Sequence, residues 1–344
     1  MTTFDDIFGQ DAAVEWLKQA HRADRLPHGL VFAGPTGVGK ATTAKALATL
    51  LLCEQPNGDS ACGTCASCRA MAAGSHPDYH VITRELIRYH DKTGKSKGID
   101  LSVHVIRPEL IEPAGRKPML GHGKVFVIEE ADAMNPQAQN ALLKTLEEPA
   151  GPTLIILLTD QPNSLLQTIR SRCQLIPFAA LDDATVRKQL EKRKIDRQTA
   201  QDATAFSEGS LGLALKWISD GVVPRAADLV HQLDSLVAGH SPDGLEVWFK
   251  AAAEEYAEKQ LKRDELASKD QATREGLALY LRLAATYFRT RMQASTDPAE
   301  LERLCGAIDA IAKAENYLWC NVNIPLIFQQ LTLAWERELA SART

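Results

Sequence analysis

The sequence has no apolar run that approaches the roughly 18 residues of a membrane-spanning helix. It also lacks the order of a secretory signal, because its first ten residues, MTTFDDIFGQ, contain acids and no basic segment followed by an apolar one. Both absences argue against a membrane or secreted protein. We therefore expect a cytoplasmic location and no membrane partner.

The chain also lacks an excess of positive charge. Its 39 Lys and Arg residues against 44 Asp and Glu residues give a formal net charge of -5 at pH 7. A protein that holds nucleic acid by bulk charge needs clustered Lys and Arg to neutralise phosphates. The balance argues against a stand-alone DNA-binding module, and we expect any DNA contact to be local or shared with partners.

Cysteine is infrequent, but its distribution is uneven. Four of the seven cysteines lie in one short stretch, as Cys53, Cys62, Cys65 and Cys68. Thiols stay reduced in the cytosol, so such a cluster favours a metal site over a disulfide pair. The spacing C-x₈-C-x₂-C-x₂-C predicts a closed structural Zn²⁺ site with four thiolate ligands. The two CxxC steps taken alone would also suit a redox pair.

Beta-rich runs are confined to the first half of the chain. Between residues 29 and 178, helical stretches separate the runs GLVFAG, DYHVIT, KVFVIEEA, TLIILLTD and CQLIPF. Near-continuous apolar strands separated by helices indicate an α/β fold with a parallel sheet covered on both faces. After Phe178 the pattern is helical. The polar stretch 89–100 is predicted to be a surface loop.

Two clusters of turn residues, FAALDDAT and SDGVVPRAAD, indicate module boundaries. We predict a sheet domain over residues 1–178, with the cysteine insertion at 53–68. A small helical domain over 179–221 and an all-α domain over 222–344 are expected to follow.

A phosphate-binding loop is predicted where GLVFAG meets PTGVGKATTAKALATLLL. The strand, Gly-rich turn and helix provide Gly34, Gly37, Gly39 and Lys40. Such glycines let backbone N–H groups converge on a phosphate, and the lysine reaches the outer phosphates of a nucleotide. The alternative is a Gly-rich turn with a solvated lysine.

The loop lacks one catalytic group. The pattern G-x-x-x-x-G-K-[ST] ends in a hydroxyl that binds Mg²⁺, and this sequence has Ala41 at that position. Thr42 is a candidate nucleotide contact, but it is rotated by about 100° around the helix. We expect hydrolysis to be lost, while the binding of ATP or ADP is left open.

Two carboxylates follow the apolar run in KVFVIEEADAMN. A strand of this kind directs Glu129 toward a metal ion and Glu130 toward an attacking water, as in a Walker B motif. Glu129 stands where Asp is usual, and the extra methylene moves the carboxylate by roughly a bond length. The alternative is a helix N-terminus decorated with acids. The upstream phosphate loop favours a degenerate nucleotide site, in which Thr159 at the end of a later strand is also included.

Several stretches together resemble the AAA+ subunits of bacterial DNA polymerase III clamp loaders. They are FGQDAAVEWLKQAHRADRLPHGLVFAGPTGVGK, the cysteine cluster, HPD, VIEEADAMNPQAQNALLKTLEEP and QTIRSRC. The similarity covers about the first 215 residues, and NALLKTLEEP followed by SRC is its most specific part. The resemblance implies an AAA+ P-loop domain with a parallel sheet, a small helical lid and a C-terminal all-α collar that joins subunits into a ring.

Two branches of this family share that architecture, the gamma/tau motor and delta-prime. Ala41 and Glu129 depart from the motor pattern, and so does Leu213, which replaces the lid arginine of the motor pattern GSxGRAL. These departures favour a delta-prime-like subunit of the DNA polymerase III holoenzyme without ATPase turnover of its own. The alternative is an active gamma/tau-like ATPase.

The resemblance also implies partners and a catalytic role. The expected partners are gamma/tau and delta in a heteropentameric ring, the sliding clamp, and primed DNA through the complex. Arg172 of the SRC motif would act in trans as an arginine finger on ATP bound by a neighbouring subunit. Arg170 is the nearest rival, and a salt bridge within its own domain is the structural alternative for Arg172.

Overall fold

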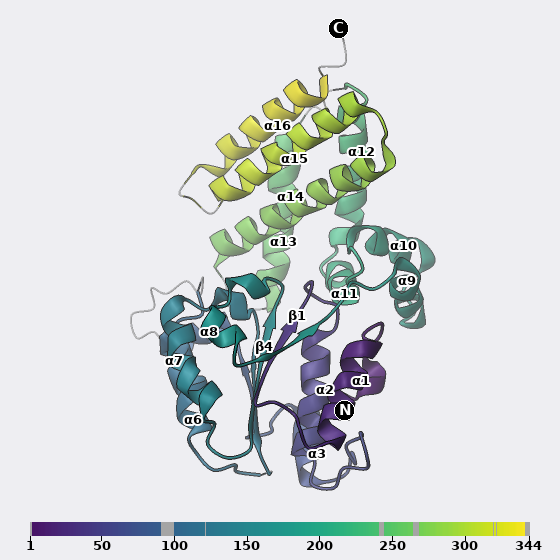
Figure 1. Ribbon diagram of the computed structural model, residues 1–344. Coiled ribbons are helices and arrows are strands. Elements are labelled where there is room, and N and C mark those ends of the chain that lie inside the picture. The colour runs from purple at the N-terminus through teal and green to yellow at the C-terminus, as the bar shows by residue number, and fades with distance from the viewer. Residues whose placement is uncertain are drawn as a thin grey trace. The chain divides into compact units, whose positions relative to one another are not determined.

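The computed structural model describes residues 2–90, 100–120, 122–240, 244–263, 268–318, 320 and 322–340 (Figure 1). The chain divides into two compact units, Met1–Gln189 with Glu208–Leu213, and Leu190–Ser207 with Ala214–Thr344. The three-domain division with boundaries at 178 and 221 stays a prediction. Most of the loop predicted at 89–100 lies outside the described residues.

A five-stranded parallel sheet forms the centre of the first unit, with the strand order β2-β3-β4-β1-β5. Each strand lies within one of the predicted apolar runs, so the predicted parallel sheet is confirmed. The strands are β1 (Gly29–Ala33), β2 (Tyr79–Ile82), β3 (Lys124–Ile128), β4 (Thr153–Thr159) and β5 (Gln174–Pro177).

Both faces of the sheet are covered by helices. Leu30 and Phe32 of β1 pack in one apolar cluster with Leu47 of α2 (Lys40–Leu52). Val31, which points the other way, packs in a second cluster with Leu142 of α7 (Pro136–Glu147). Burial on both faces explains why the central strands β1, β3 and β4 read as continuous apolar runs. Figure 1 shows α1, α2 and α3 on one side of the sheet and α6, α7 and α8 on the other.

Short helices complete the first unit. Helix α7 begins after Asn135, whose Oδ1 accepts the backbone N–H of Ala138 at 2.9 Å, and Pro136 occupies its first position. The others are α1 (Asp11–Arg22), α3 (Ala66–Ala73), α4 (Ile87–His90), α5 (Val103–Ile106), α6 (Glu112–Ala114) and α8 (Gln167–Arg170). Helices α9 (Asp183–Lys192) and α11 (Leu211–Ser219) each contain a division point between the two units.

The regular elements in the described residues of the second unit are all helices. An aromatic core holds it together: Trp335 is fully buried, donates from Nε1 to the carbonyl oxygen of Ala307 at 3.0 Å and packs against Phe288. No helix in the described part of the chain is long and apolar enough to cross a membrane. The helices are α10 (Arg197–Phe206), α12 (Val222–Val237), α13 (Leu245–Arg263), α14 (Lys269–Ala294), α15 (Pro298–Leu318) and α16 (Ile324–Ala340).

Candidate functional site

The predicted phosphate loop connects the end of β1 to the start of α2. Gly39, just before α2, has a φ of 112°, which L side chains rarely adopt. Lys40 begins the helix and is only 9% exposed. Its Nζ donates to the carbonyl oxygens of Gly34 at 2.5 Å and Pro35 at 2.7 Å. The lysine ammonium therefore points back onto its own loop, where a phosphate would compete for it.

The first turn of α2 carries two hydroxyls, those of Thr42 and Thr43, and neither is at the position of Ala41. Ala41 is exposed and Thr42 is half-buried. The hydroxyl of Thr43 donates to the carbonyl oxygen of Gly39 at 2.9 Å, so it is engaged within the helix. A methyl group occupies the position from which a hydroxyl would bind Mg²⁺.

The segment that begins α11 lies against the phosphate loop. Ser210 Oγ donates to the carbonyl oxygen of Thr36 at 2.7 Å. The N–H of Gly212 donates to the carbonyl oxygen of Gly37 at 2.8 Å. The N–H of Leu213 donates to Ser210 Oγ at 3.1 Å. Leu213 therefore lies beside Ser210 and Gly212, which contact the phosphate loop. It carries an apolar side chain where the motor pattern has an arginine.

The two carboxylates after β3 have different surroundings. Glu129 is half-buried, and burial, followed by the nearby Glu130 and Glu85, raises the pKa of its carboxyl. Glu130 is exposed with a φ of 50°, and its Oε2 lies 3.0 Å from Nε of Arg84. Arg84 belongs to no recognised motif, so the sequence alone does not single it out; its position just after β2 is the signal that it offers.

Thr159 links the end of β4 to the phosphate loop. Its carbonyl oxygen accepts the N–H of Gly34 at 3.1 Å, and its buried hydroxyl donates to Oδ1 of Asp132 at 2.7 Å. Burial lowers the pKa of Lys40, while the charges of Asp160 and Asp132 oppose that lowering. Asp132 is a second polar residue of this region that the sequence analysis did not single out.

The predicted nucleotide residues follow strands of one parallel sheet and therefore meet at a single edge, the carboxyl ends of β1, β3 and β4. This arrangement offers backbone N–H groups, one ammonium and two carboxylates, but no hydroxyl for Mg²⁺ at the usual position. The residues are Gly34, Gly37, Gly39, Lys40, Thr42, Glu129, Glu130 and Thr159.

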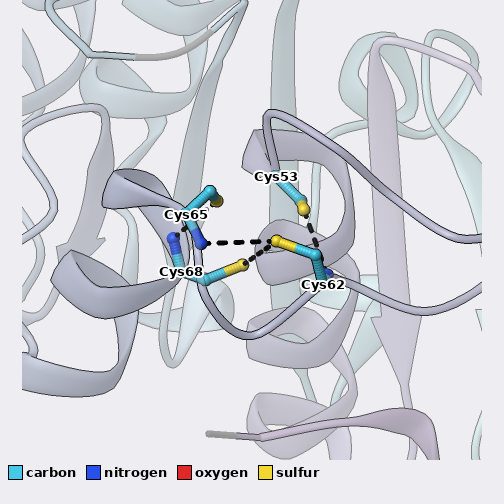
Figure 2. A group of neighbouring side chains, drawn as sticks. All are labelled: Cys53, Cys62, Cys65 and Cys68. Atoms are coloured by element: carbon cyan, nitrogen blue, oxygen red, sulfur yellow. Dashed lines mark hydrogen bonds between the residues drawn. The ribbon is translucent and has the colours of Figure 1, made fainter.

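The four clustered cysteines converge around one point (Figure 2). Cys53 follows α2, Cys65 precedes α3, and their Sγ atoms and those of Cys62 and Cys68 all lie within 4.8 Å of one another. The Sγ atoms of Cys62 and Cys68 are 3.9 Å apart. Tetrahedral Zn–S bonds of about 2.3 Å place sulfurs about 3.8 Å apart. The cluster therefore fits a four-thiolate metal site.

Backbone N–H groups surround the sulfurs. The N–H of Cys62 donates to Sγ of Cys53 at 3.2 Å, and the N–H of Cys65 donates to Sγ of Cys62 at 3.4 Å (Figure 2). The N–H of Cys68 donates to Sγ of Cys65 at 3.3 Å. N–H donors from Thr64 and Cys65 lower the pKa of Cys62 to about 6, whereas burial raises that of Cys68 to about 12. A bound cation would favour the thiolate form of the buried sulfurs.

A buried hydrogen-bond chain joins the cysteine module to the sheet. Ser67 Oγ, between two of the cysteines, donates to the carbonyl oxygen of Leu52 at 2.5 Å and lies 2.8 Å from Nε2 of His76. The N–H of Asp78 donates to Nδ1 of His76 at 3.1 Å, which places the ring proton on Nε2. His76 and Asp78 of the HPD stretch are therefore structural residues.

Arg172, between α8 and β5, contacts its own domain. Its Nε donates to Oε1 of Glu147 at 2.6 Å, Nη2 contacts the same oxygen, and Nη1 donates to the carbonyl oxygen of Thr168 at 3.0 Å. The alternative salt bridge is thus present in the isolated chain. Arg170 instead donates to Oδ1 of Asn163 at 3.0 Å.

Arg172 and the phosphate loop lie at opposite ends of the sheet. Leu30 of β1 pairs with Gln174, two residues after Arg172, whereas Ala33 at the other end of β1 leads into the loop. A strand rises about 3.3 Å per residue, so the five residues of β1 separate the two ends by about 13 Å. That distance exceeds the reach of an arginine side chain.

Comparison with known proteins identifies the family. A family model described as DNA polymerase III, delta subunit, matches residues 9–182. The DNA polymerase III subunit delta' of Pseudomonas aeruginosa is 35% identical over 236 residues, which cover 67% of this chain and 67% of the relative. The chain belongs to the delta-prime family of DNA polymerase III clamp-loader subunits.

A second delta' relative agrees with this assignment, and a tau subunit is similar over a smaller share of its own length. The Escherichia coli subunit delta' is 37% identical over 202 residues, 58% of this chain and 57% of its own length. Escherichia coli subunit tau is 31% identical over 247 residues, 70% of this chain but only 36% of its own. The predicted delta-prime resemblance and the predicted α/β AAA+ fold class are confirmed.

Proposed function

We propose that this delta-prime family member helps load the sliding clamp without hydrolysing ATP itself, and that it supplies Arg172 to the ATP site of a neighbouring ATPase subunit. The position of Arg172 supports this function best. It lies at the end of the sheet opposite its own phosphate loop, so it can act only on nucleotide held by another chain. There a guanidinium would stabilise charge that develops on the γ-phosphoryl group.

The chain's own nucleotide site is proposed to be degenerate. Ala41 removes the Mg²⁺ hydroxyl, Glu129 replaces the usual Asp, and Leu213 brings no charge to the loop. The backbone cradle and Lys40 can still contact phosphates of ATP or ADP without a metal. Before it can do so, the ammonium of Lys40 has to exchange its bonds with the carbonyl oxygens of its own loop.

The proposed partners follow from the family. Relatives named subunits tau and gamma/tau support a complex with such motor subunits. We further propose delta as a partner, a heteropentameric ring joined through a collar at residues 222–344, and contact with the sliding clamp and primed DNA through the complex. The cytoplasm is the proposed location.

The cysteine module is proposed to hold one structural Zn²⁺. Four Sγ atoms within 4.8 Å of one another match the tetrahedral thiolate set that zinc prefers. Four protein ligands leave no open position for a reactive water. The metal would fix the end of α2 to α3, and it would supply no catalytic chemistry.

The proposed finger is tested by Arg172→Ala in the reconstituted complex, with Arg170→Ala as the control. The Arg172→Ala subunit should assemble normally, because an exposed ion pair adds at most about 1 kcal/mol to stability. In single-turnover hydrolysis, one ATP per complex should enter a slow phase with a rate lower by about 10³. Unchanged hydrolysis and clamp loading by a fully assembled Arg172→Ala complex would refute the proposal.

A second candidate function is that of a motor. Its supporting observation is the intact strand, Gly-rich loop and Lys40, together with the match to tau. Mg²⁺-dependent ATP hydrolysis by the purified chain distinguishes it from the first proposal.

A further inference from the structure

The partner of Arg172 within its own domain is Glu147, the last residue of α7. The carboxylate oxygen Oε1 contacts both Nε and Nη2 of the guanidinium, while the carbonyl oxygen of Thr168 accepts from Nη1. The guanidinium is therefore held along one edge by a charge and at its third nitrogen by the backbone. The pair is accessible, with 35% of the Arg172 side chain and 48% of the Glu147 side chain exposed.

The backbones that carry this pair are fixed against the start of β1. A Cβ built on Gly29 would lie 3.2 Å from the carbonyl oxygen of Arg172, 2.8 Å from Sγ of Cys173 and 3.1 Å from Cδ2 of Leu146. Only glycine leaves room for this close approach without a shift of its neighbours. The end of α7 and the chain at Arg172 thus meet the central sheet at one closely packed point.

Stability of the fold does not account for Glu147. An ion pair as exposed as this one contributes little to the free energy of unfolding. A carboxylate in the last turn of a helix also opposes the helix dipole, which favours cations there. The contact instead fixes the orientation of the Arg172 side chain, because a long arginine side chain has many rotamers and the carboxylate selects among them.

We propose that Glu147 is a positioning residue for Arg172 that presents its guanidinium in one orientation to the γ-phosphate of ATP bound by the neighbouring subunit. This inference rests on the proposed finger function. A donor that is oriented in advance needs no reorganisation when charge develops in the transition state, so loss of the carboxylate slows hydrolysis more than it weakens ATP binding.

The test uses the reconstituted clamp loader carrying Glu147→Ala or Glu147→Gln. With Glu147→Ala, single-turnover hydrolysis at one site per complex should slow by about tenfold, as expected when one charge-assisted contact is lost, while ATP affinity stays unchanged. Glu147→Gln keeps an acceptor oxygen and should give an intermediate rate. Glu148→Gln is the matched control, because it removes the same charge from the adjacent exposed residue and should leave the rate unchanged.

A double variant tests whether Glu147 acts through Arg172. Glu147→Ala combined with Arg172→Ala should be no slower than Arg172→Ala alone. A further slowing in the double variant, or an unmodified rate for Glu147→Ala beside a slow Arg172→Ala, would overturn the positioning role and leave the finger proposal standing. If Arg172→Ala itself has no effect, the finger proposal fails. Should Glu147→Ala not assemble, the near-isosteric Glu147→Gln supplies the same comparison.

Discussion

Arg84 and Glu130 form an ion pair, with Nε of the arginine 3.0 Å from Oε2 of the glutamate. Glu130 is the carboxylate that a Walker B strand would direct toward an attacking water, and here a cation at the end of β2 holds it. Under the proposed function, the pair and the methyl group of Ala41 affect two different parts of the same site, the base and the metal ligand. Restoring one part is therefore not expected to restore hydrolysis.

The first prediction concerns the purified chain with ATP and Mg²⁺. It should release no phosphate, and Ala41→Ser should not create activity, because Glu129 and Leu213 still depart from the motor pattern. A steady-state assay of phosphate release measures both. Turnover on the 1–100 s⁻¹ scale typical of kinases, abolished by Lys40→Ala, would favour the motor alternative.

The second prediction concerns zinc. Metal analysis should find about one zinc per chain, and Cys62→Ser or Cys68→Ser should lose it because three thiolates no longer close the tetrahedron. Cys305→Ser is the control, since this exposed cysteine lies outside the cluster. If the folded protein, purified without exposure to a chelator, contains no zinc, the cluster is not a structural zinc site.

The third prediction separates the effect of positive charge from that of the planar guanidinium shape at the proposed finger, Arg172. In the reconstituted complex, Arg172→Lys should restore little of the hydrolysis lost in Arg172→Ala, because an ammonium lacks the planar donor fork. Arg170→Lys is the control and should leave the rate unchanged, because the proposal assigns contact with the partner's ATP to Arg172 and not to Arg170. Full activity of Arg172→Lys in single-turnover hydrolysis would mean that positive charge alone suffices.

The fourth prediction concerns His76 and pH. Burial, reinforced by His80 and opposed by Asp78, lowers the pKa of His76 below its ordinary value of about 6.5. The unfolded chain therefore binds a proton first as the pH falls. The stability due to neutral His76 is fully present above pH 6.5 and is lost as the pH falls from there through the folded-state pKa. Urea unfolding at pH 7.5 and 5.5 measures this loss.

His76→Gln should remove part of that pH dependence and should destabilise the chain by about 1–3 kcal/mol at pH 7.5, because buried hydrogen bonds are lost. His28→Gln is the control, because His28 is exposed. The comparison is made at constant zinc, so that any metal contribution is common to both variants. An unchanged difference between the two pH values in His76→Gln would contradict the assignment.

Local sequence was sufficient for the order of the strands and helices and for the convergence of the four clustered cysteines. The apolar runs predicted all five strands. The signal is strongest in β1, β3 and β4, which are buried at every position because both faces of the sheet are covered, and weaker in the edge strands β2 and β5, which are only partly buried. Cys62, Cys65 and Cys68 follow one another at three-residue intervals, so chain connectivity keeps their sulfurs close, while Cys53 joins them from the end of α2. Motif order in the first 215 residues also identified the family.

Only the tertiary structure decided the pairings between distant segments. Arg84 with Glu130, Thr159 with Asp132, and Arg172 with Glu147 each join residues about 25 or more positions apart. No local propensity encodes such contacts, because they depend on which strands become neighbours and on where each helix ends. The sequence by itself determined which groups the chain carries. The parallel pairing of β5 with β1 placed Arg172, which precedes β5, at the end of the sheet opposite the phosphate loop, which follows β1.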